Sequence, residues 1–216
     1  VVQVESKGKF CYIVFADGTA LGIGYGMTGN IRIEPDEKYL AQRKETKTQY
    51  MKHCAVRFTH SIAGQEKPGI FYYHDIRRFG FIHYLTERDL KRKLVELGPS
   101  ILDDNPLSSE ELVKIWRRGN NKNICVLMLN HQDLISGIGN YLKAEALYLC
   151  RVHPLAQTRD LSDDTLYDLY LTVSQLARSA YIEGGASLYT FTGLHGDKSE
   201  FKSKLSVYNR SLDPLG

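Results

Sequence analysis

The 216-residue sequence is 43% apolar and 25% charged, which is ordinary for a soluble globular protein and sufficient for one large domain or two small ones. Its formal charge of +3 permits a nucleic-acid partner without requiring one. The four cysteines contain no CxxC pair, which excludes a zinc ribbon, and no run of about 18 apolar residues could span a membrane. Without a signal-like start, the chain is predicted to be intracellular, with reduced thiols.

The first half of the chain is predicted to form antiparallel strands. Two apolar runs, Phe10–Phe15 and Thr19–Ile23, are separated by the turn signal Asp17-Gly18. Between later strands, the polar stretch 35–53 is interpreted as a surface excursion. The further strand patterns are "NIRIE", "CAVRFTH", "GIFYYHD" and "GFIHYL".

From about residue 86 the period of the apolar residues becomes helical. "TERDLKRKLVELGPS" predicts a short amphipathic helix that Gly98-Pro99 ends. "SSEELVKIWRRGN" predicts a helix capped by Ser108 or Ser109, and "NICVLMLNH" an apolar helical segment.

The longest predicted helix begins after the cap Ser162 and ends at Gly184-Gly185. After it, the tail "EFKSKLSVYNRSLDPLG" is predicted to turn back toward strand structure. One face of the helix is expected to be apolar, with Leu166, Tyr170, Val173, Ala177 and Ala180.

The stretch "ISGIGN" places two glycines in front of the predicted helix Tyr141–Cys150. Gly137 and Gly139 are predicted to form a tight turn, and Asn140 is expected at the N-cap. Two interpretations remain open at this point. The turn either simply precedes a capped helix, or its free backbone N–H groups bind an anion such as phosphate.

The stretch "GYGMTG", Gly24 to Gly29, satisfies the G-x-G-x-x-G pattern of nucleotide-binding proteins. A dinucleotide site requires a helix directly after the pattern, but "NIRIE" is predicted to be a strand. The kinase version is also disfavoured, because its later motifs do not follow. We interpret the segment as a glycine-rich hairpin that exposes Met27 at its tip.

The stretch "HDIRRFGF", residues 74–81, places two arginines and a phenylalanine between strands. It is either a solvated turn with one core aromatic, or a nucleic-acid contact in which arginines bind phosphates and the ring enters a base stack. The lysines of "KGK", residues 7–9, could likewise contact phosphate or simply be solvated. No catalytic motif is recognisable.

Together, these segments resemble the formamidopyrimidine-DNA glycosylase/endonuclease VIII (Fpg/Nei) family. "ICVLMLNHQDLISGIGNYLKAEALYLCRVHPLA" is similar to its helix–two-turn–helix, "GYGMTG" to its Met-bearing hairpin, "DIRRFG" to its Arg/Phe loop and "KGKF" to its phosphate-contacting lysine site. "LGPS" resembles the interdomain stretch, and "GGASLYTF" and "LSVYNR" follow in the family's order. The versions of these motifs resemble the Nei-like branch, and Leu215, where zinc-bearing relatives have cysteine, points to its zincless-finger subgroup.

The resemblance implies an α+β fold. An antiparallel β-sandwich domain (1–88) and an interdomain segment (89–105) would precede an all-α helix–two-turn–helix domain (106–190) and the start of a zincless β-hairpin finger (191–216). The sandwich and the finger are expected to be incomplete. Glu145 matches an acid of the family and is expected to have a structural role.

The implied function is that of a bifunctional DNA glycosylase/AP lyase of base excision repair, which flips out oxidised bases and cleaves at the abasic site by β/δ-elimination. The residues expected to bind DNA phosphates are Lys9, Gly137, Gly139 and Asn140. The residues expected to fill the void left by the flipped nucleotide are Met27, Arg77 and Phe79.

The family's nucleophile is an N-terminal proline followed by glutamate, which does not stand at the head of this sequence, so no catalytic residue is assigned. No metal and no cofactor are expected. The expected partner is damaged double- or single-stranded DNA, and no association with a membrane is expected. The protein is expected to be a monomer located with genomic DNA, in a nucleus or in a bacterial or viral compartment. The alternative function is a non-catalytic DNA- or RNA-binding helix–two-turn–helix module.

Overall fold

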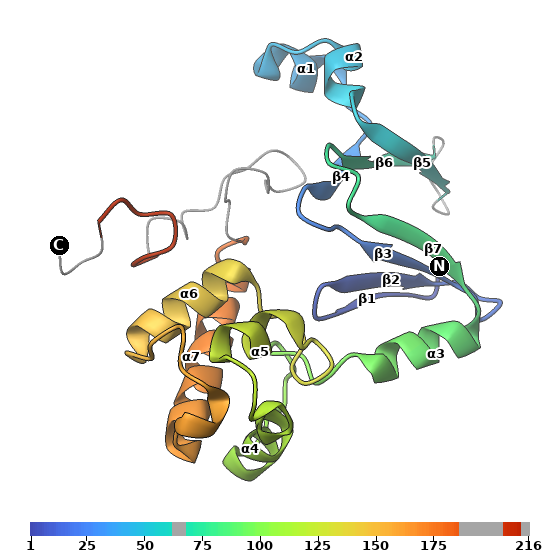
Figure 1. Ribbon diagram of the computed structural model, residues 1–216. Coiled ribbons are helices and arrows are strands. Elements are labelled where there is room, and N and C mark those ends of the chain that lie inside the picture. The colour runs from blue at the N-terminus through green and yellow to red at the C-terminus, as the bar shows by residue number, and fades with distance from the viewer. Residues whose placement is uncertain (62–67, 186–204, 213–216) are drawn as a thin grey trace.

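A computed structural model describes residues 1–61, 68–185 and 205–212 of the chain (Figure 1). Strands dominate up to residue 85 and helices dominate after it, which confirms the predicted α+β class. In Figure 1 the strands, coloured blue to green, lie beside a helical bundle coloured yellow-green to orange. Within the described part of the chain, the strands form two antiparallel sheets.

The first sheet has the strand order β1-β2-β3-β7 and packs one face on helix α3 (Glu87–Glu96). Phe10, Tyr12 and Ala20 of this face form a small core with Leu90 of the helix. The ammonium of Lys7 donates to the Leu94 carbonyl at 2.8 Å, which ties the sheet to the end of the helix. The strands are β1 (Gln3–Lys7), β2 (Phe10–Val14), β3 (Ala20–Gly24) and β7 (Phe81–Leu85).

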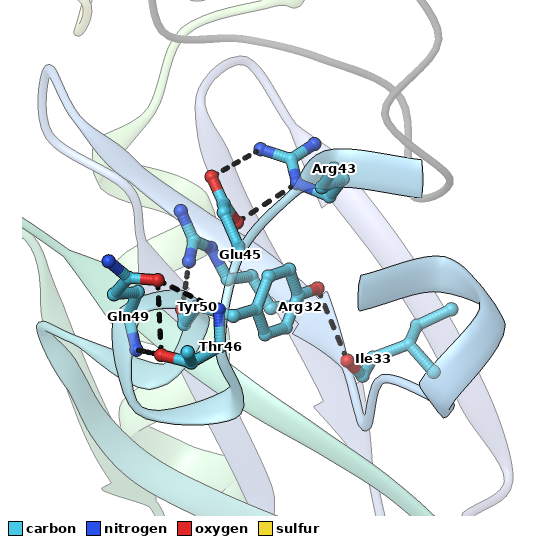
Figure 2. Close-up of polar contacts among 7 residues, drawn as sticks. All are labelled: Arg32, Ile33, Arg43, Glu45, Thr46, Gln49 and Tyr50. Atoms are coloured by element: carbon cyan, nitrogen blue, oxygen red, sulfur yellow. Dashed lines mark hydrogen bonds and ion pairs between the residues drawn. The ribbon is translucent and has the colours of Figure 1, made fainter. Parts of the chain in front are cut away.

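The second sheet has the order β4-β6-β5. The predicted surface excursion between its first two strands in sequence contains two short helices, α1 (Glu37–Arg43) and α2 (Lys47–Met51). Helix α2 begins with a capping box, in which Thr46 and Gln49 satisfy each other's backbone N–H groups (Figure 2). The strands are β4 (Gly29–Ile33), β5 (Cys54–His60) and β6 (Gly69–Asp75).

Tyr50 fastens the two short helices to the second sheet (Figure 2). Its ring is buried, and its hydroxyl donates to the Ile33 carbonyl at 3.2 Å. The Arg32 guanidinium lies 4.7 Å from the ring centroid and donates to the Tyr50 carbonyl. A polar segment that looks like an excursion in the sequence is therefore held in place by one buried aromatic residue.

The segment Gly24–Gly29 is not a hairpin, so that prediction is wrong. Strand β3, which precedes it, pairs with β2 on one side and β7 on the other, while β4, which follows, pairs with β6 in the second sheet. Both edges of β3 are already occupied, so the chain must cross from one sheet to the other. Met27 is nevertheless exposed, at 61%, as predicted.

The helices after α3 share one apolar core, which includes the fully buried Trp116, Ile124 and Leu166. Ser108 is the cap of the first of these helices, with Glu111 completing a capping box. The predicted apolar face of the longest helix is buried as expected. The elements are α4 (Ser109–Trp116), η1 (Arg117–Gly119), α5 (Ile124–Asn130), α6 (Asn140–Leu149), η2 (Thr158–Asp160) and α7 (Asp163–Ile182).

Glu145 on α6 has the structural role expected of it. Its side chain is 1% exposed and accepts backbone hydrogen bonds from Ser206, Val207 and Tyr208 at 2.7, 2.9 and 2.6 Å. The described residues there, 205–212, form turns and bends. Most of the predicted finger, including Leu215, lies outside the described residues.

Candidate functional site

The residues Ser136 to Asn140, here called the glycine turn, lead into helix α6. Gly137 has a φ of +103°, a conformation that favours glycine. Asn140 is not the N-cap, contrary to the prediction: Gly139 takes the extended cap conformation and Asn140 is the first helical residue. The side-chain oxygen of Asn140 instead accepts a hydrogen bond from the Lys143 ammonium at 2.8 Å.

A glycine cap leaves the start of α6 open. Gly139 has no side chain to accept from the first turn, and within the described residues the backbone N–H groups of Gly139 and Asn140 have no acceptor. The N-terminus of a helix carries a partial positive charge. The unpaired donors and this charge both favour a bound anion over the simpler interpretation of a capped helix.

Lys9 lies directly beside this helix start, although it belongs to the turn between β1 and β2. Its ammonium donates to the Ile138 carbonyl at 2.6 Å and lies 3.8 Å from the point that a Cβ on Gly139 would occupy. Loss of water around the ammonium lowers the pKa of Lys9. The structure therefore brings together all the residues predicted to bind phosphate, and places a cation next to open N–H groups.

The close approach of the two turns depends on Gly8. A Cβ at this position would lie 2.8 Å from the Ser136 Cβ and 3.0 Å from the Gly137 nitrogen, and the φ of Gly8 is +58°. A larger residue would push the β1–β2 turn away and carry Lys9 with it. The buried Ser136 hydroxyl donates to the Gly98 carbonyl at 2.9 Å, so the glycine turn is also fixed to the segment after α3.

The second set of predicted residues also comes together, as a cluster of Met27, Arg77 and Phe79. The Arg77 guanidinium lies 3.5 Å from the Met27 sulfur and 4.7 Å from the centre of the Phe79 ring. Phe79 is 61% exposed, so the alternative that it is a core aromatic is wrong. Two apolar side chains and a stacked guanidinium thus form an exposed group that could contact bases.

Asp75 holds this cluster in place and was missed in the sequence. Its side chain is 3% exposed and accepts from the Thr28 hydroxyl and from the backbone N–H groups of Arg77 and Gly80, the latter at 2.8 Å. Burial by itself raises the pKa of Asp75, but these hydrogen bonds outweigh it and hold the pKa below its usual value. A carboxylate at the end of an apolar strand, directly before an arginine-rich loop, was the available signal.

Within the described residues, no three His, Cys, Asp or Glu side chains are grouped as metal ligands would be. In the same ranges, none of the helices has both the length and the apolar character needed to cross a membrane.

The sequence of this chain is similar to one described family and to individual proteins of that name. Residues 1–82 match the family described as formamidopyrimidine-DNA glycosylase N-terminal domain. A formamidopyrimidine-DNA glycosylase of Thermomicrobium roseum is 29% identical over 219 residues, covering 97% of this chain and 71% of the relative. Another, of Haemophilus influenzae, is 27% identical over 214 residues, covering 99% and 72%.

Two solved structures have the same fold. The MutM (Fpg) protein of Thermus thermophilus has a TM-score of 0.77 at 24% identity, covering 97% of this chain and 71% of that one. A Lactococcus lactis Fpg in complex with DNA containing an abasic site has a TM-score of 0.74 at 22% identity, covering 95% and 69%.

Proposed function

We propose that this chain belongs to the formamidopyrimidine-DNA glycosylase/endonuclease VIII family and acts in base excision repair as a bifunctional DNA glycosylase/AP lyase. It would flip an oxidised base out of damaged DNA, remove it and cleave the strand at the abasic site by β/δ-elimination. The observation that carries the proposal is the position of the Lys9 ammonium beside the open N-terminus of α6.

The site around Lys9 suits a DNA phosphate on chemical grounds. A phosphate oxygen can accept from the N–H groups of Gly139 and Asn140 while the lysine neutralises its charge. Gly137 contributes differently, because its own N–H already donates to Gln132 at 2.9 Å. Its role in the proposed site is to give the turn its shape.

The cluster of Met27, Arg77 and Phe79 suits a different task, which is to replace a flipped nucleotide. Extruding a base leaves an unstacked space in the duplex, and apolar or guanidinium groups placed there recover part of the lost stacking. The exposure of Met27 and Phe79 supports this role, since side chains buried in the protein could not enter DNA.

The chemistry of the family requires an amine that attacks the deoxyribose C1′. The C1′–base bond breaks as the amine bonds to C1′, and the resulting Schiff base makes elimination of the phosphate possible. In the family this amine belongs to an N-terminal proline, and we assign the role to no described residue of this chain. The described residues supply the grip on the DNA and the group that fills the void.

The proposed partner is damaged DNA, double- or single-stranded, bound by a monomer. Because such DNA is genomic, the protein works inside the cell. We propose that it lies in whichever compartment holds that DNA, a nucleus or a bacterial or viral compartment. The second candidate function is that of a DNA- or RNA-binding module without catalysis. The open start of α6 supports it equally well, because a phosphate can bind there whether or not a reaction follows.

Borohydride trapping of the full-length protein on a duplex with a single abasic site distinguishes these functions. A trapped covalent complex is expected, because reduction captures the Schiff base of a lyase. Tight binding to the abasic duplex without trapping would instead favour the non-catalytic module. Equal affinity for abasic and intact duplex would contradict the void-filling role as well.

A further inference from the structure

Gln132 links the two helix ends that meet at the glycine turn. It follows helix α5 closely, and its side-chain NH2 donates to the Leu129 carbonyl at 3.0 Å and the Ile138 carbonyl at 3.3 Å. Its side-chain oxygen accepts from the Gly137 N–H at 2.9 Å. One amide therefore uses both its donors and its acceptor between the end of α5 and the turn before α6.

The Ile138 carbonyl is the point at which Gln132 and Lys9 converge. It accepts from the glutamine NH2 and also from the Lys9 ammonium, at 2.6 Å. Because Gln132 orients this carbonyl, it also determines where the ammonium rests relative to the start of α6. The backbone of Gln132 is fixed in turn, since its carbonyl accepts from the Gly98 N–H at 2.9 Å.

We propose that Gln132 is a positioning residue for the phosphate site: it holds the glycine turn so that the Lys9 ammonium and the free N–H groups of Gly139 and Asn140 face one phosphate. This inference rests on the proposed function. The glutamine does not itself contact the phosphate. Without its side chain the Gly137 N–H loses its acceptor, and the turn loses the contact that selects its unusual backbone conformation.

Gln132→Met tests this role, because methionine has a similar length and lacks both the amide oxygen and the amide NH2. Affinity for an abasic-site duplex, measured over a series of salt concentrations, is expected to fall by about tenfold. The slope of log K against log salt is expected to decrease in magnitude by about 0.9, the value for one phosphate contact. Combining Gln132→Met with Lys9→Ala should cost less than the sum of the two single changes, since both act on one contact. Gln175→Met is the matched control, because Gln175 is an exposed glutamine on α7.

Two further measurements separate positioning from a loss of folding. Hydrogen exchange of the Gly137 amide should be faster in folded Gln132→Met than in the parent, while the thermal midpoint reports overall stability. Gln132→Glu should bind the duplex poorly at neutral pH, where a carboxylate cannot donate to Ile138. It should move toward the parent at acidic pH, where a protonated carboxyl regains one donor for the Ile138 carbonyl and keeps an acceptor for the Gly137 N–H.

The inference is overturned if folded Gln132→Met keeps the parent's affinity and salt slope while Lys9→Ala loses both. The proposed function would then stand. If instead the parent and Lys9→Ala bind equally and with the same salt slope, no phosphate site exists at this helix, and both the inference and its premise are wrong.

Discussion

Lys9 and Ile138 are 129 positions apart in the chain, yet the ammonium of one donates to the carbonyl of the other at 2.6 Å. This bond joins the β-rich half of the molecule to its helical half at the start of α6. Figure 1 shows the turn between β1 and β2 next to the helical bundle. The proposed phosphate site is thus built from both halves, and the first two predictions depend on it.

Lys9→Ala should weaken DNA binding and reduce the salt slope by about 0.9, the value for one lost phosphate contact. Folding stability should change little, because the Ile138 carbonyl keeps the Gln132 NH2 as a donor and the loss of the ammonium also removes the cost of its desolvation. Titrations of an abasic duplex at several salt concentrations provide the measurement. Lys114→Ala on α4, an exposed lysine of the helical half, is the control, and an equal effect in both variants would show only nonspecific attraction.

Asn140→Ala should weaken DNA binding without destabilising the protein. Loss of a true N-cap asparagine costs about 1 kcal/mol, but Gly139 is the cap here and Asn140 is exposed in the first turn. Urea unfolding should therefore give nearly the parent's free energy, while affinity for the duplex falls. A clear loss of stability would indicate that the asparagine caps the helix after all.

Arg77→Ala and Phe79→Ala should each reduce the preference for damaged over intact duplex, because the two side chains act as one stacked group. Affinity for intact duplex should be less affected. Competition between abasic and intact duplexes measures the ratio directly. If both variants discriminate as well as the parent, the cluster does not fill a void.

Asp75→Asn should loosen the loop that carries Arg77 and Phe79. The asparagine keeps the shape of the side chain but turns one acceptor oxygen into a donor. That donor faces the backbone N–H of either Arg77 or Gly80, because these two groups bond to different oxygens of the carboxylate. A mismatch at a buried site of this kind costs about 1–3 kcal/mol. Discrimination should fall as in Arg77→Ala, now together with stability, and unchanged thermal unfolding would argue against this anchoring role.

The stability of the fold should decrease as the pH falls from about 6.5 to 4, because of His74. Burial, followed by the charges of Arg32 and His53, lowers the pKa of His74 to about 4. The unfolded chain therefore binds a proton in this window that the folded chain does not, which costs about 1–3 kcal/mol at its acidic end. Urea unfolding across the window measures the loss, and His74→Gln should flatten it. A slope unchanged by this substitution would assign the pH dependence to other groups.

The sequence was most informative where the determinants of structure are local. The cap Ser162 and the apolar face of α7 depend on residues within one helix, so pattern and capping preferences predicted them. The same preferences narrowed the cap of α4 to Ser108 or Ser109, and it is Ser108. The partner of a strand is not a local property. The pattern around Met27 resembles a hairpin, but pairing of Gly24 with Phe81 across the sheet decides the topology.

For the candidate site, too, some features could be predicted from the sequence and others could not. The residue types that suit phosphate and bases could be chosen from motifs, and the structure places them in two clusters. The choice of Gly139 rather than Asn140 as cap was out of reach, because both residue types are accepted at that position. Asp75 and Gln132 were missed for another reason. Their bonds to the Gly80 and Gly137 N–H groups span only five residues, but an irregular loop has no period from which such acceptors could be recognised.

The contact between Gly8 and Ser136 bears on how the two halves can move. There the backbone of Gly8 lies against the Ser136 side chain and the Gly137 nitrogen, and the Ser136 hydroxyl is itself held by its hydrogen bond to the Gly98 carbonyl. Any rigid rotation of one half against the other that preserves this contact must have its axis close to it. Lys9 and the glycine turn would then move least, and a ligand held between them would keep its place while the rest of one half turns against the other.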